Sequence, residues 1–513
     1  MGRPARRTRR GQPVAEGVSL QAPVGGWNAR DPLSAMDPLD AVVLDNWFPE
    51  TREVRLRGGY VAFSNDLGAP VETLFEYQAG ATAAFLAAAD GEIWDITSGT
   101  GVSLDSGFAN DRWQHVTFTT TGGTFIIAVN GEDDPILYDG SAVSTAAITS
   151  VTGGQETLVD VMAYSGRLFF AQVNSLSLWY LDPLAIAGAA SEYDVGAFCL
   201  RGGSVAALAT WTRDNGFGGV DDLFVVFTTQ GELLMFSGDD PGSSTAWQFL
   251  GRFEVGRPIG RRCVVRFGPE LIIINEDGFV PLSRLLTVDR TQADAIAISE
   301  KIGNAVTQAA RSFGTLFGWQ GAIYPAGNMG VFNIPTSSTT SEQYVANTIT
   351  GAWCRFTGQN AACWGLFNGG LYFGSPNGVV YRADTGANDD GVNIEADLQT
   401  AFTYPGGRGV QKRFTMVRPI FVTNGILTPS IGVLVDFDIR DVEAPVSSIA
   451  TGTIWGQFTW GDALWGSTSQ LQRNWVGVSG VGYAASLRFR VSTASVRVRF
   501  QSFDMLYERG AFL

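Results

Sequence analysis

The stretch AFLAAADGEIWDI, residues 84–96, decides the fold class because it contains a complete β-hairpin. An apolar segment runs into Asp90-Gly91, and a second segment follows and ends on Ile96. Asp-Gly supplies the positive φ angles that a type I′ turn requires, and this turn matches the right-handed twist of paired strands. The sequence therefore predicts two antiparallel strands joined by a two-residue turn.

The same unit recurs between about residue 61 and residue 390. Its other copies have turns at Asn130-Gly131, Asn174-Ser175, Gln230-Gly231, Asp277-Gly278 and Asn377-Gly378, and one further copy, residues 330–347, has a polar tip near Ser338. The first five turns follow one another at intervals of 40 to 56 residues. Periods of about 40–50 residues with several strands are typical of β-propeller blades. We expect an all-β chain with an irregular propeller of six or seven blades over 61–390, and an array of β-sandwiches is the alternative.

The composition also favours sheets. Of 513 residues, 63 are Gly, 12% are aromatic and only 17% are charged, which suits strands joined by tight turns. A chain of this length is expected to form at least two domains. The net charge of −15 argues against a surface that binds nucleic acid, because affinity for phosphates comes from clustered Lys and Arg.

The N-terminal region differs from the repeats. Residues 1–24 contain five arginines and little to bury, which predicts a flexible basic arm. Residues 25–60 form a signature segment that we expect to lead into the ring. Within it, Asp37 is suited to cap a short helix that begins at Pro38 and ends before Pro49.

Two later regions have other patterns. Residues 300–313 place five apolar residues on one face, which predicts a helix packed against the ring; they are Ile302, Ala305, Val306, Ala309 and Phe313. After residue 390, long alternating segments predict a separate β-sandwich-like domain over 391–513. The arginines of its segments 487–491 and 496–500 are expected to face solvent or a partner subunit.

Catalytic chemistry finds little support. The single histidine, His115, lies in a strand pattern, so a multi-histidine metal site is excluded and a Ser-His-Asp triad has one candidate base. We interpret His115 as structural, and we expect no enzymatic activity, no cofactor and no metal. The cysteines fall in no C-x-x-C pair and are expected to be buried thiols of a protein folded in a reducing cytoplasm; they are Cys199, Cys263, Cys354 and Cys363.

Two short motifs resemble binding loops. Residues 103–107, SLDSG, match the first part of the Asp-box of sialidase-like propellers without its closing aromatic residue, and a polar turn is the simpler interpretation. Residues 388–391, NDDG, with Asp397 downstream, resemble part of a calcium loop. However, Gly386 occupies the first ligand position and no helices are predicted at its flanks, so a solvated linker is favoured.

Two features are candidates for protein interfaces. The N-terminal arginines form either a solubilising tail or an arm that orders on an acidic neighbour; they are Arg3, Arg6, Arg7, Arg9 and Arg10. Trp-Gly recurs at Trp455, Trp460 and Trp465, and a spacing of five cannot keep three rings on one face of a strand. These tryptophans either pack within the C-terminal domain or anchor another protein, since Trp is enriched at interface hot spots.

The signature segment carries a family resemblance. Gly25-Gly26, Asn46-Trp47 and the run VRLRGG at 54–59 resemble the N-terminus of the tail tubular protein B, or tail nozzle, family of short-tailed bacteriophages, and more loosely the packaged-DNA stabilisation proteins. The resemblance implies a virion protein made in the host cytoplasm. It implies a homohexameric ring below the portal and its adaptor ring, which continues the exit channel for genomic double-stranded DNA and carries tail fibres or tailspikes. The family brings no catalytic residues.

Two other functions remain open. A glycan-binding or sialidase-like propeller would require a carboxylate pair and an arginine cluster at the centre of the ring, and a head-completion plug would share the virion but not the channel. The basic N-terminus is not followed by an apolar region, so no secretory signal peptide is expected. No run approaches the ~18 apolar residues of a membrane-spanning helix.

Overall fold

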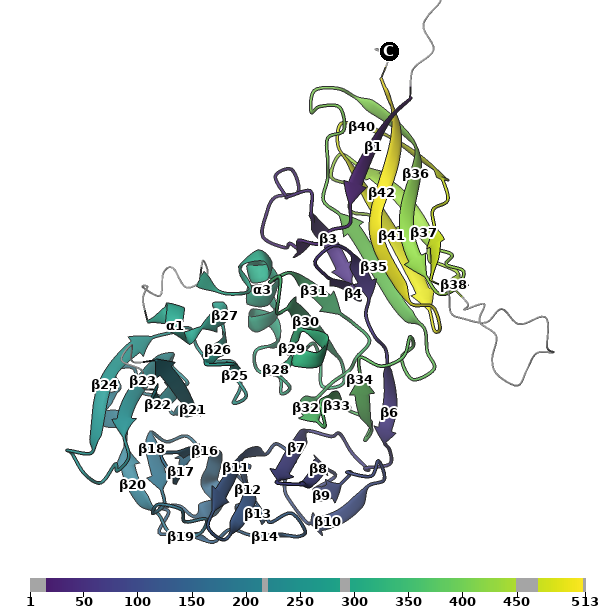
Figure 1. Ribbon diagram of the computed structural model, residues 1–513. Coiled ribbons are helices and arrows are strands. Elements are labelled where there is room, and N and C mark those ends of the chain that lie inside the picture. Colours follow the sequence, from purple (N-terminus) through teal and green to yellow (C-terminus); the bar gives the residue numbers. More distant parts are fainter. Residues whose placement is uncertain (1–14, 215–219, 287–295, 449–468, 511–513) are drawn as a thin grey trace, which may run out of the picture. The chain divides into compact units, whose positions relative to one another are not determined.

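The protein, seen in a computed structural model, is described over residues 15–214, 220–286, 296–448 and 469–510 (Figure 1). Strands make up 52% of it and helices 6%, which confirms the all-β class. The chain divides into two compact units. We call residues 58–391 the propeller unit, and residues 1–57 together with 392–513 the two-sheet unit.

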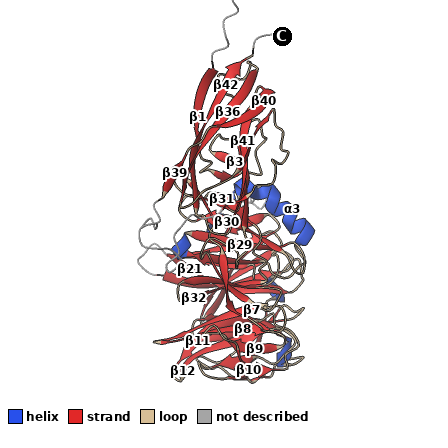
Figure 2. Cartoon of the chain, turned by 90° about the vertical axis from the view of Figure 1, so that its right-hand side faces the viewer, coloured by secondary structure: helices blue, strands red, loops and turns tan. Residues whose placement is uncertain are grey.

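The propeller unit consists of antiparallel blades that follow one another along the chain (Figures 1 and 2). The first three blades have four strands each: β7 (Thr73–Ala79), β8 (Thr82–Ala89), β9 (Glu92–Asp95) and β10 (Val102–Ser106); β11 (Gln114–Thr120), β12 (Gly123–Val129), β13 (Ile136–Tyr138) and β14 (Val143–Thr145); β16 (Leu158–Tyr164), β17 (Arg167–Gln172), β18 (Ser177–Tyr180) and β20 (Ser191–Asp194). Two short strands, β15 (Ile148–Thr149) and β19 (Gly188–Ala189), pair in parallel beside them.

Four further blades complete the set: β21 (Val205–Asp214), β22 (Val220–Thr228), β23 (Glu232–Gly238) and β24 (Trp247–Glu254); β25 (Val264–Phe267), β26 (Glu270–Asn275) and β27 (Gly278–Pro281); β28 (Gln320–Tyr324), β29 (Met329–Pro335), β30 (Ser341–Asn347) and β31 (Trp353–Phe356); β32 (Cys363–Phe367), β33 (Gly370–Gly374), β34 (Val380–Ala383) and β6 (Tyr60–Ser64). Six of the blades are separate sheets. The seventh group, β28–β31, lies between the β25–β27 blade and the β32 blade, because β28 contacts both β25 and β32. The expected propeller is therefore confirmed.

The ring is closed by a strand from the start of the unit. β6 pairs with β34, which lies near the C-terminal end of the propeller unit, and β32 packs beside β7 of the first blade. The Tyr60 N–H donates to the Asn388 carbonyl at 3.0 Å, and the Asp390 N–H donates to the Tyr60 carbonyl at 2.8 Å. A Cβ atom on Gly59 would collide with the Asn388 carbonyl, so a glycine is needed where the chain enters the ring.

The apolar faces of the blades are buried against their neighbours. Between the third and fourth blades, Phe169 lies 4.6 Å from Phe224 and 5.8 Å from Trp247, measured between ring centroids. Each such ring removes about 150–250 Å² of surface from water. A single blade leaves these faces exposed, so the ring is the unit that buries a core.

The predicted hairpins form, but the predicted turn type is only partly right. At Asp90-Gly91 both residues have positive φ, 58° and 69°, as a type I′ turn requires. At Asn130-Gly131 only the glycine does, with φ 85°, because the Asn130 side chain accepts the next backbone N–H groups and holds a longer loop. Two further turns with both φ angles positive, Ser165-Gly166 and Asn368-Gly369, join the first two strands of their blades.

Short helices lie between the strands of the propeller unit: η1 (Gln155–Thr157), η2 (Gly196–Phe198), α1 (Leu282–Leu285), η4 (Glu300–Ile302), α3 (Gly303–Phe313) and η5 (Pro325–Gly327). The predicted helix over 300–313 corresponds to η4 and α3. Ile302, Val306 and Ala309 are buried, and α3 packs against β27 and β29. The expectation of a helix packed on the ring is therefore confirmed.

The two-sheet unit contains one sheet of β39 (Gln470–Gln472), β36 (Lys412–Thr423), β42 (Val498–Arg509), β5 (Val54–Leu56) and β4 (Trp47–Pro49), joined by β1 (Ala15–Gln21) and β40 (Val476–Gly482). The second sheet contains β2 (Gly26–Trp27), β3 (Asp40–Asp45), β35 (Ile394–Thr400), β41 (Ala485–Thr493), β37 (Ser430–Val435) and β38 (Ser447–Ser448). Phe489 of the second sheet contacts Trp47, Phe421 and Phe500 of the first, with centroids 4.9–5.4 Å apart. The sheets therefore share one aromatic core.

The N-terminal segment differs from the sequence interpretation. Residues 15–21, assigned to the arm, form β1 and pair with β42. The helix expected from Pro38 is wrong, because the Asp37 carboxylate accepts the Leu39 N–H at 2.8 Å in a turn and the following apolar residues pair with β35 as β3. Strands β3, β4 and β5 thus belong to the two-sheet unit, whereas β6 enters the ring.

One expectation about the C-terminal arginines is also wrong. Arg488 on β41 is only 5% exposed, because its guanidinium binds Asp397 at 2.7 Å and Asp441 at 2.5 Å. Arg497 and Arg499 on the neighbouring segment are exposed as predicted. An alternating Arg pattern does not distinguish a solvent-facing side chain from one that is buried against carboxylates.

Candidate functional site: the central cavity of the propeller

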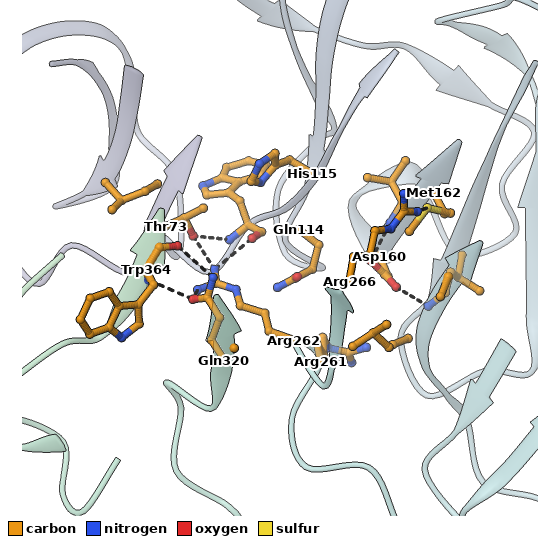
Figure 3. Close-up of a pocket in the computed structure, with 18 residues that line it drawn as sticks. Thr73, Gln114, His115, Asp160, Met162, Arg261, Arg262, Arg266, Gln320 and Trp364 are labelled. Atoms are coloured by element: carbon orange, nitrogen blue, oxygen red, sulfur yellow. Dashed lines mark hydrogen bonds between the residues drawn. The ribbon is translucent and has the colours of Figure 1, made fainter. Parts of the chain in front are cut away.

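A cavity of about 220 Å³ lies where the blades of the propeller unit converge (Figure 3). Its wall comes mainly from the beginnings of the first strand of every blade, including β28 and β32. The polar and charged lining residues are Thr73, Gln114, His115, Asp160, Arg261, Arg262, Arg266 and Gln320. Three of the eight are arginines, although the whole chain is acidic.

Arg262 reaches across the centre of the ring (Figure 3). It precedes β25, and its Nη2 donates to Thr73 Oγ1 at 2.8 Å and to the Trp113 carbonyl at 3.1 Å, on the first and second blades. Its Nη1 donates to the Glu72 carbonyl at 2.9 Å. All of these acceptors are neutral, and burial lowers the pKa of Arg262 from its ordinary value. The side chain ties opposite sides of the ring together without an ion pair.

An aromatic ring completes the surroundings of Arg262. Its guanidinium carbon lies 5.1 Å from the centroid of the Phe317 ring, and that of Arg112 lies 4.6 Å from the same centroid. Arg112 is neutralised by both oxygens of Glu72, at 3.0 and 3.1 Å. Phe317 therefore sits beside one paired and one unpaired cation, an arrangement stabilised by the ring quadrupole.

Asp160 and Arg261 lie on the other side of the cavity. Asp160 is 7% exposed, and its carboxylate accepts the Leu208 N–H at 2.7 Å and the Val161 N–H at 2.9 Å. Burial raises the pKa of Asp160 to about 7, although these N–H groups and Arg261 oppose the shift. Within the described residues, Arg261 has no hydrogen-bond partner, and burial lowers its pKa.

Arg266 connects the cavity with solvent. The residue is exposed, and its Nη2 donates to Thr210 Oγ1 at 2.5 Å and approaches the Met162 sulfur at 3.7 Å. Its partners are neutral, and burial lowers the pKa of its guanidinium although the charge of Asp222 opposes the shift. A ligand entering the cavity from outside therefore meets a cation at the entrance.

His115 has a neutral ring in this wall. It is the second residue of β11, and its ring centroid lies 4.8 Å from that of Phe75. Burial, together with the charge of Arg262, lowers the pKa of His115 to about 4. No serine is among the described residues lining the cavity, and Asp160 is the one carboxyl group among them. The cavity therefore has cations suited to bind an anion and lacks the paired acids of a glycosidase.

None of the residues of the motifs identified in the sequence lines this cavity. SLDSG at 103–107 covers the end of the outermost strand β10, where Asp105 accepts the N–H of its neighbour Ser106 at 2.9 Å. In NDDG, the Asn388 side chain accepts the Gly391 N–H at 2.8 Å and Asp390 accepts the Ala62 N–H of β6 at 3.3 Å. Asp397 binds Arg488. These residues thus fix turns and strands.

The predicted interface residues fall outside the described residues: Arg3, Arg6, Arg7, Arg9, Arg10, Trp455, Trp460 and Trp465. All four cysteines are free, and three of them are buried, Cys199 being partly exposed. The sequence interpretation missed the cavity arginines. A signal was present in RRCVVRF at 261–267, where three arginines flank the start and end of a short apolar strand.

Comparison with known proteins assigns no family. No protein-family model matches the sequence, and no curated protein matches it. The computationally designed protein Ika8 matches with 10% identity and a TM-score of 0.37, over 64% of this chain and 99% of that chain. A chain of the BBS1N–ARL6DN complex matches with 11% identity and a TM-score of 0.39, over 64% and 97%.

The extracellular domain of the hybrid two-component system BT3049 from B. thetaiotaomicron matches with 12% identity and a TM-score of 0.43, over 71% of this chain and 51% of that chain. Similarity at this level carries no information about function. Within the described ranges, no helix has the length and hydrophobicity to cross a membrane. The same ranges contain no cluster of three or more His, Cys, Asp or Glu side chains arranged to hold a metal ion.

Proposed function

We propose that the chain is a structural protein of the tail of a short-tailed bacteriophage, a nozzle subunit that forms part of the DNA exit channel. In this role it assembles as a homohexamer, docks to the portal adaptor and carries fibres or tailspikes. It catalyses no reaction. The proposal rests on one observation, the structural role of the residues that carry the family resemblance.

Those residues are buried parts of the frame. Trp47 is fully buried beside Phe489, and Asn46 adopts a positive φ of 62°. The Arg57 Nε donates to the Asn46 side chain at 2.8 Å, and both residues are buried. A Cβ on Gly25 would lie 2.9 Å from the Leu39 carbonyl. A resemblance at such positions points to a shared frame, since these positions tolerate few replacements.

The central cavity bears on the path of the DNA. Arg262 spans the ring, and the cavity measures about 220 Å³. A duplex whose major groove alone is about 12 Å wide cannot pass through it. The channel would therefore run between subunits of the hexamer. At −15 charges per copy, an acidic wall would not bind phosphates, and its repulsion would reach only ~8 Å at physiological salt.

Negative-stain microscopy of the full-length protein, alone and mixed with its adaptor, tests this proposal. The expected result is a hollow six-membered ring that stacks on the adaptor. Replacing the five arginines at positions 3, 6, 7, 9 and 10 by Gln is expected to abolish stacking and leave the fold intact. Replacing Arg311 and Arg440, which are exposed elsewhere, is the matched control. If only monomers were seen, both for the protein alone and for its mixture with the adaptor, the proposal would be overturned.

A second candidate, a propeller that binds acidic sugars, is favoured by the arginine cluster at the ring centre. Hydrolysis of a glycan would need two carboxyl groups, and Asp160 is the one carboxyl group among the described residues that line the cavity. A glycan array and a sialidase assay on the purified protein separate the two candidates. Saturable binding of sialylated glycans that is lost in Arg261→Gln would favour the second, and an absence of both signals agrees with the nozzle.

A further inference from the structure

We propose that the central cavity of the propeller unit is a binding site for a small oxyanion, a phosphate or a short carboxylate. Arg261 would hold the anion, Arg266 would attract it at the entrance, and Arg262 would add charge from across the ring. This inference does not depend on the nozzle function. It rests on charge balance, on free donors and on the size of the cavity.

The charges in the cavity are not balanced by the protein. In the described part of the chain, none of the three arginines forms a salt bridge with a carboxylate. Asp160 interacts electrostatically with Arg261 and offsets one charge when it is ionised. His115 has a pKa of about 4 and is therefore neutral at higher pH. Asp222 acts on Arg266 at longer range. Unpaired charges are costly to hold in a cavity, so a bound anion would stabilise the fold.

The hydrogen-bond donors are distributed so that one arginine is available. Arg262 uses its Nη atoms on Thr73 and on backbone carbonyls. Arg261 has none of its five donors engaged within the described residues. A guanidinium binds phosphate or carboxylate through two parallel hydrogen bonds, which are about twice as strong as neutral ones. Arg261 is therefore the anchor of the site.

The volume selects a small ligand. At about 220 Å³, the cavity is below the roughly 300–1,000 Å³ of sites for drug-sized molecules. Arg266 is exposed at its edge, so an anion from solvent has an entrance. The other lining residues are apolar and range in size from Gly321 and Ala207 to Trp113 and Trp364, so they offer no competing charge to an anion.

Isothermal titration of the full-length protein measures the binding directly. Inorganic phosphate, sulfate and malonate are titrated separately against a chloride buffer of equal ionic strength at pH 8. We expect saturable binding at one site per chain for at least one of these probes. Arg261→Gln is expected to weaken it at least about tenfold, the value of one lost charge-assisted hydrogen bond. Arg311→Gln, on the exposed face of α3, is the matched control and should leave the affinity unchanged.

Asp160→Asn provides a variant with the opposite sign. Sulfate is the probe, because its charge does not change between pH 6 and pH 8. Removing the carboxylate is expected to strengthen sulfate binding several-fold at pH 8, where Asp160 is ionised, and to have a smaller effect at pH 6. A gain of affinity cannot arise from a misfolded variant, so this result protects the test from a loss of structure in Arg261→Gln.

Three results would overturn the proposal. One is the absence of saturable binding of all three probes to the unmodified protein. Another is an affinity that is the same in Arg261→Gln as in Arg311→Gln. The third is binding of sialic acid without binding of any small anion, which would assign the cavity to an acidic sugar instead.

Discussion

Two arginines, the buried Arg488 of the two-sheet unit and the partly buried Arg262 of the propeller unit, are satisfied in opposite ways. Arg488 of the two-sheet unit donates to both oxygens of Asp397 and to Asp441, and also to the carbonyls of Ile439 and Arg440. Arg262 of the propeller unit donates to a hydroxyl and to backbone carbonyls. Burial alone lowers the pKa of both, but the carboxylates reverse the shift at Arg488, whereas Arg262 remains below its ordinary value.

This difference distinguishes an arginine whose charge is used within the fold from one whose charge is available to a ligand. At Arg488, two carboxylates face the cation, so no unbalanced positive charge is left and the arginine contributes packing and hydrogen bonds. At Arg262, the charge is left to act on the cavity, and Arg261 and Arg266 add to it. A ligand site is therefore expected where buried cations have neutral partners. The following substitutions test whether this distinction holds.

The largest effect is expected from Arg488→Ala. It leaves Asp397 without its cation and two carbonyls without a donor, which should cost about 3–5 kcal/mol in the free energy of unfolding of the two-sheet unit. Hydrogen–deuterium exchange in increasing denaturant measures the two units separately. Arg440→Ala is the control, since its side chain is 71% exposed and a surface ion pair contributes at most about 1 kcal/mol. If Arg488→Ala and Arg440→Ala lowered the free energy of unfolding equally, the comparison between Arg488 and Arg262 would lose its basis.

Arg262→Met should be less costly, about 2 kcal/mol. It leaves the Glu72 and Trp113 carbonyls without this donor, whereas Thr73 Oγ1 still accepts the Trp113 N–H. Unmet acceptors cost about 1–3 kcal/mol. No carboxylate is left behind, and the cavity gives water access to the freed groups. The same exchange measurement on peptides of the propeller unit gives the value. A loss larger than that of Arg488→Ala would show that neutral partners hold an arginine more strongly than carboxylates do.

Stability against pH should show two opposing contributions from the cavity. Asp160 titrates near 3.8 when unfolded and near 7 when folded. The folded state therefore holds the extra proton, and stability falls as pH rises from about 4 to 7. His115 titrates near 6.5 unfolded and near 4 folded, so its contribution makes stability rise over that window up to pH 6.5.

Single substitutions should separate these contributions. Asp160→Asn is expected to make the melting temperature rise with pH between 4 and 6.5, by a few degrees relative to the unmodified protein. His115→Gln is expected to make the melting temperature fall between pH 4 and pH 7, relative to the unmodified protein. Melting curves at fixed ionic strength give both slopes. Parallel profiles for all three proteins would mean that neither group is buried as described.

The sequence predicted the repeated part of the fold and missed the cavity, for a physical reason. Hairpins such as Asp90-Gly91 are local, because the turn residues and the alternating strands lie within one short stretch. The helix at 300–313 is likewise visible from its own periodicity. The prediction of a helix from Pro38 was wrong, because β3 pairs with β35, which lies more than 340 residues later in the chain. This pairing overrides the local signal for a helix cap at Asp37.

The cavity depends on contacts that no local pattern contains. Arg262 meets Thr73 across 189 positions of the sequence, and Asp160 meets the Leu208 N–H of the next blade. His115 could be placed on a strand from the sequence, and its structural interpretation stays a prediction. Its proximity to three arginines follows only from closure of the ring. Sites built by ring closure are therefore the part of such a protein least visible in its sequence.

The smallest effect is expected at Phe317, whose ring lies beside both Arg262 and Arg112. Phe317→Leu keeps most of the apolar surface and removes the quadrupole that attracts the cations. Because Arg112 also binds Glu72, the loss should come mainly from Arg262 and amount to about 0.5–1 kcal/mol. In the Arg262→Met background, the same substitution should cost less, and the double-mutant cycle isolates the coupling. If Phe317→Leu cost the same free energy of unfolding with Arg262 present and with Met at position 262, the Phe317 ring would only fill space. The charge of Arg262 would then interact with the cavity and not with the ring.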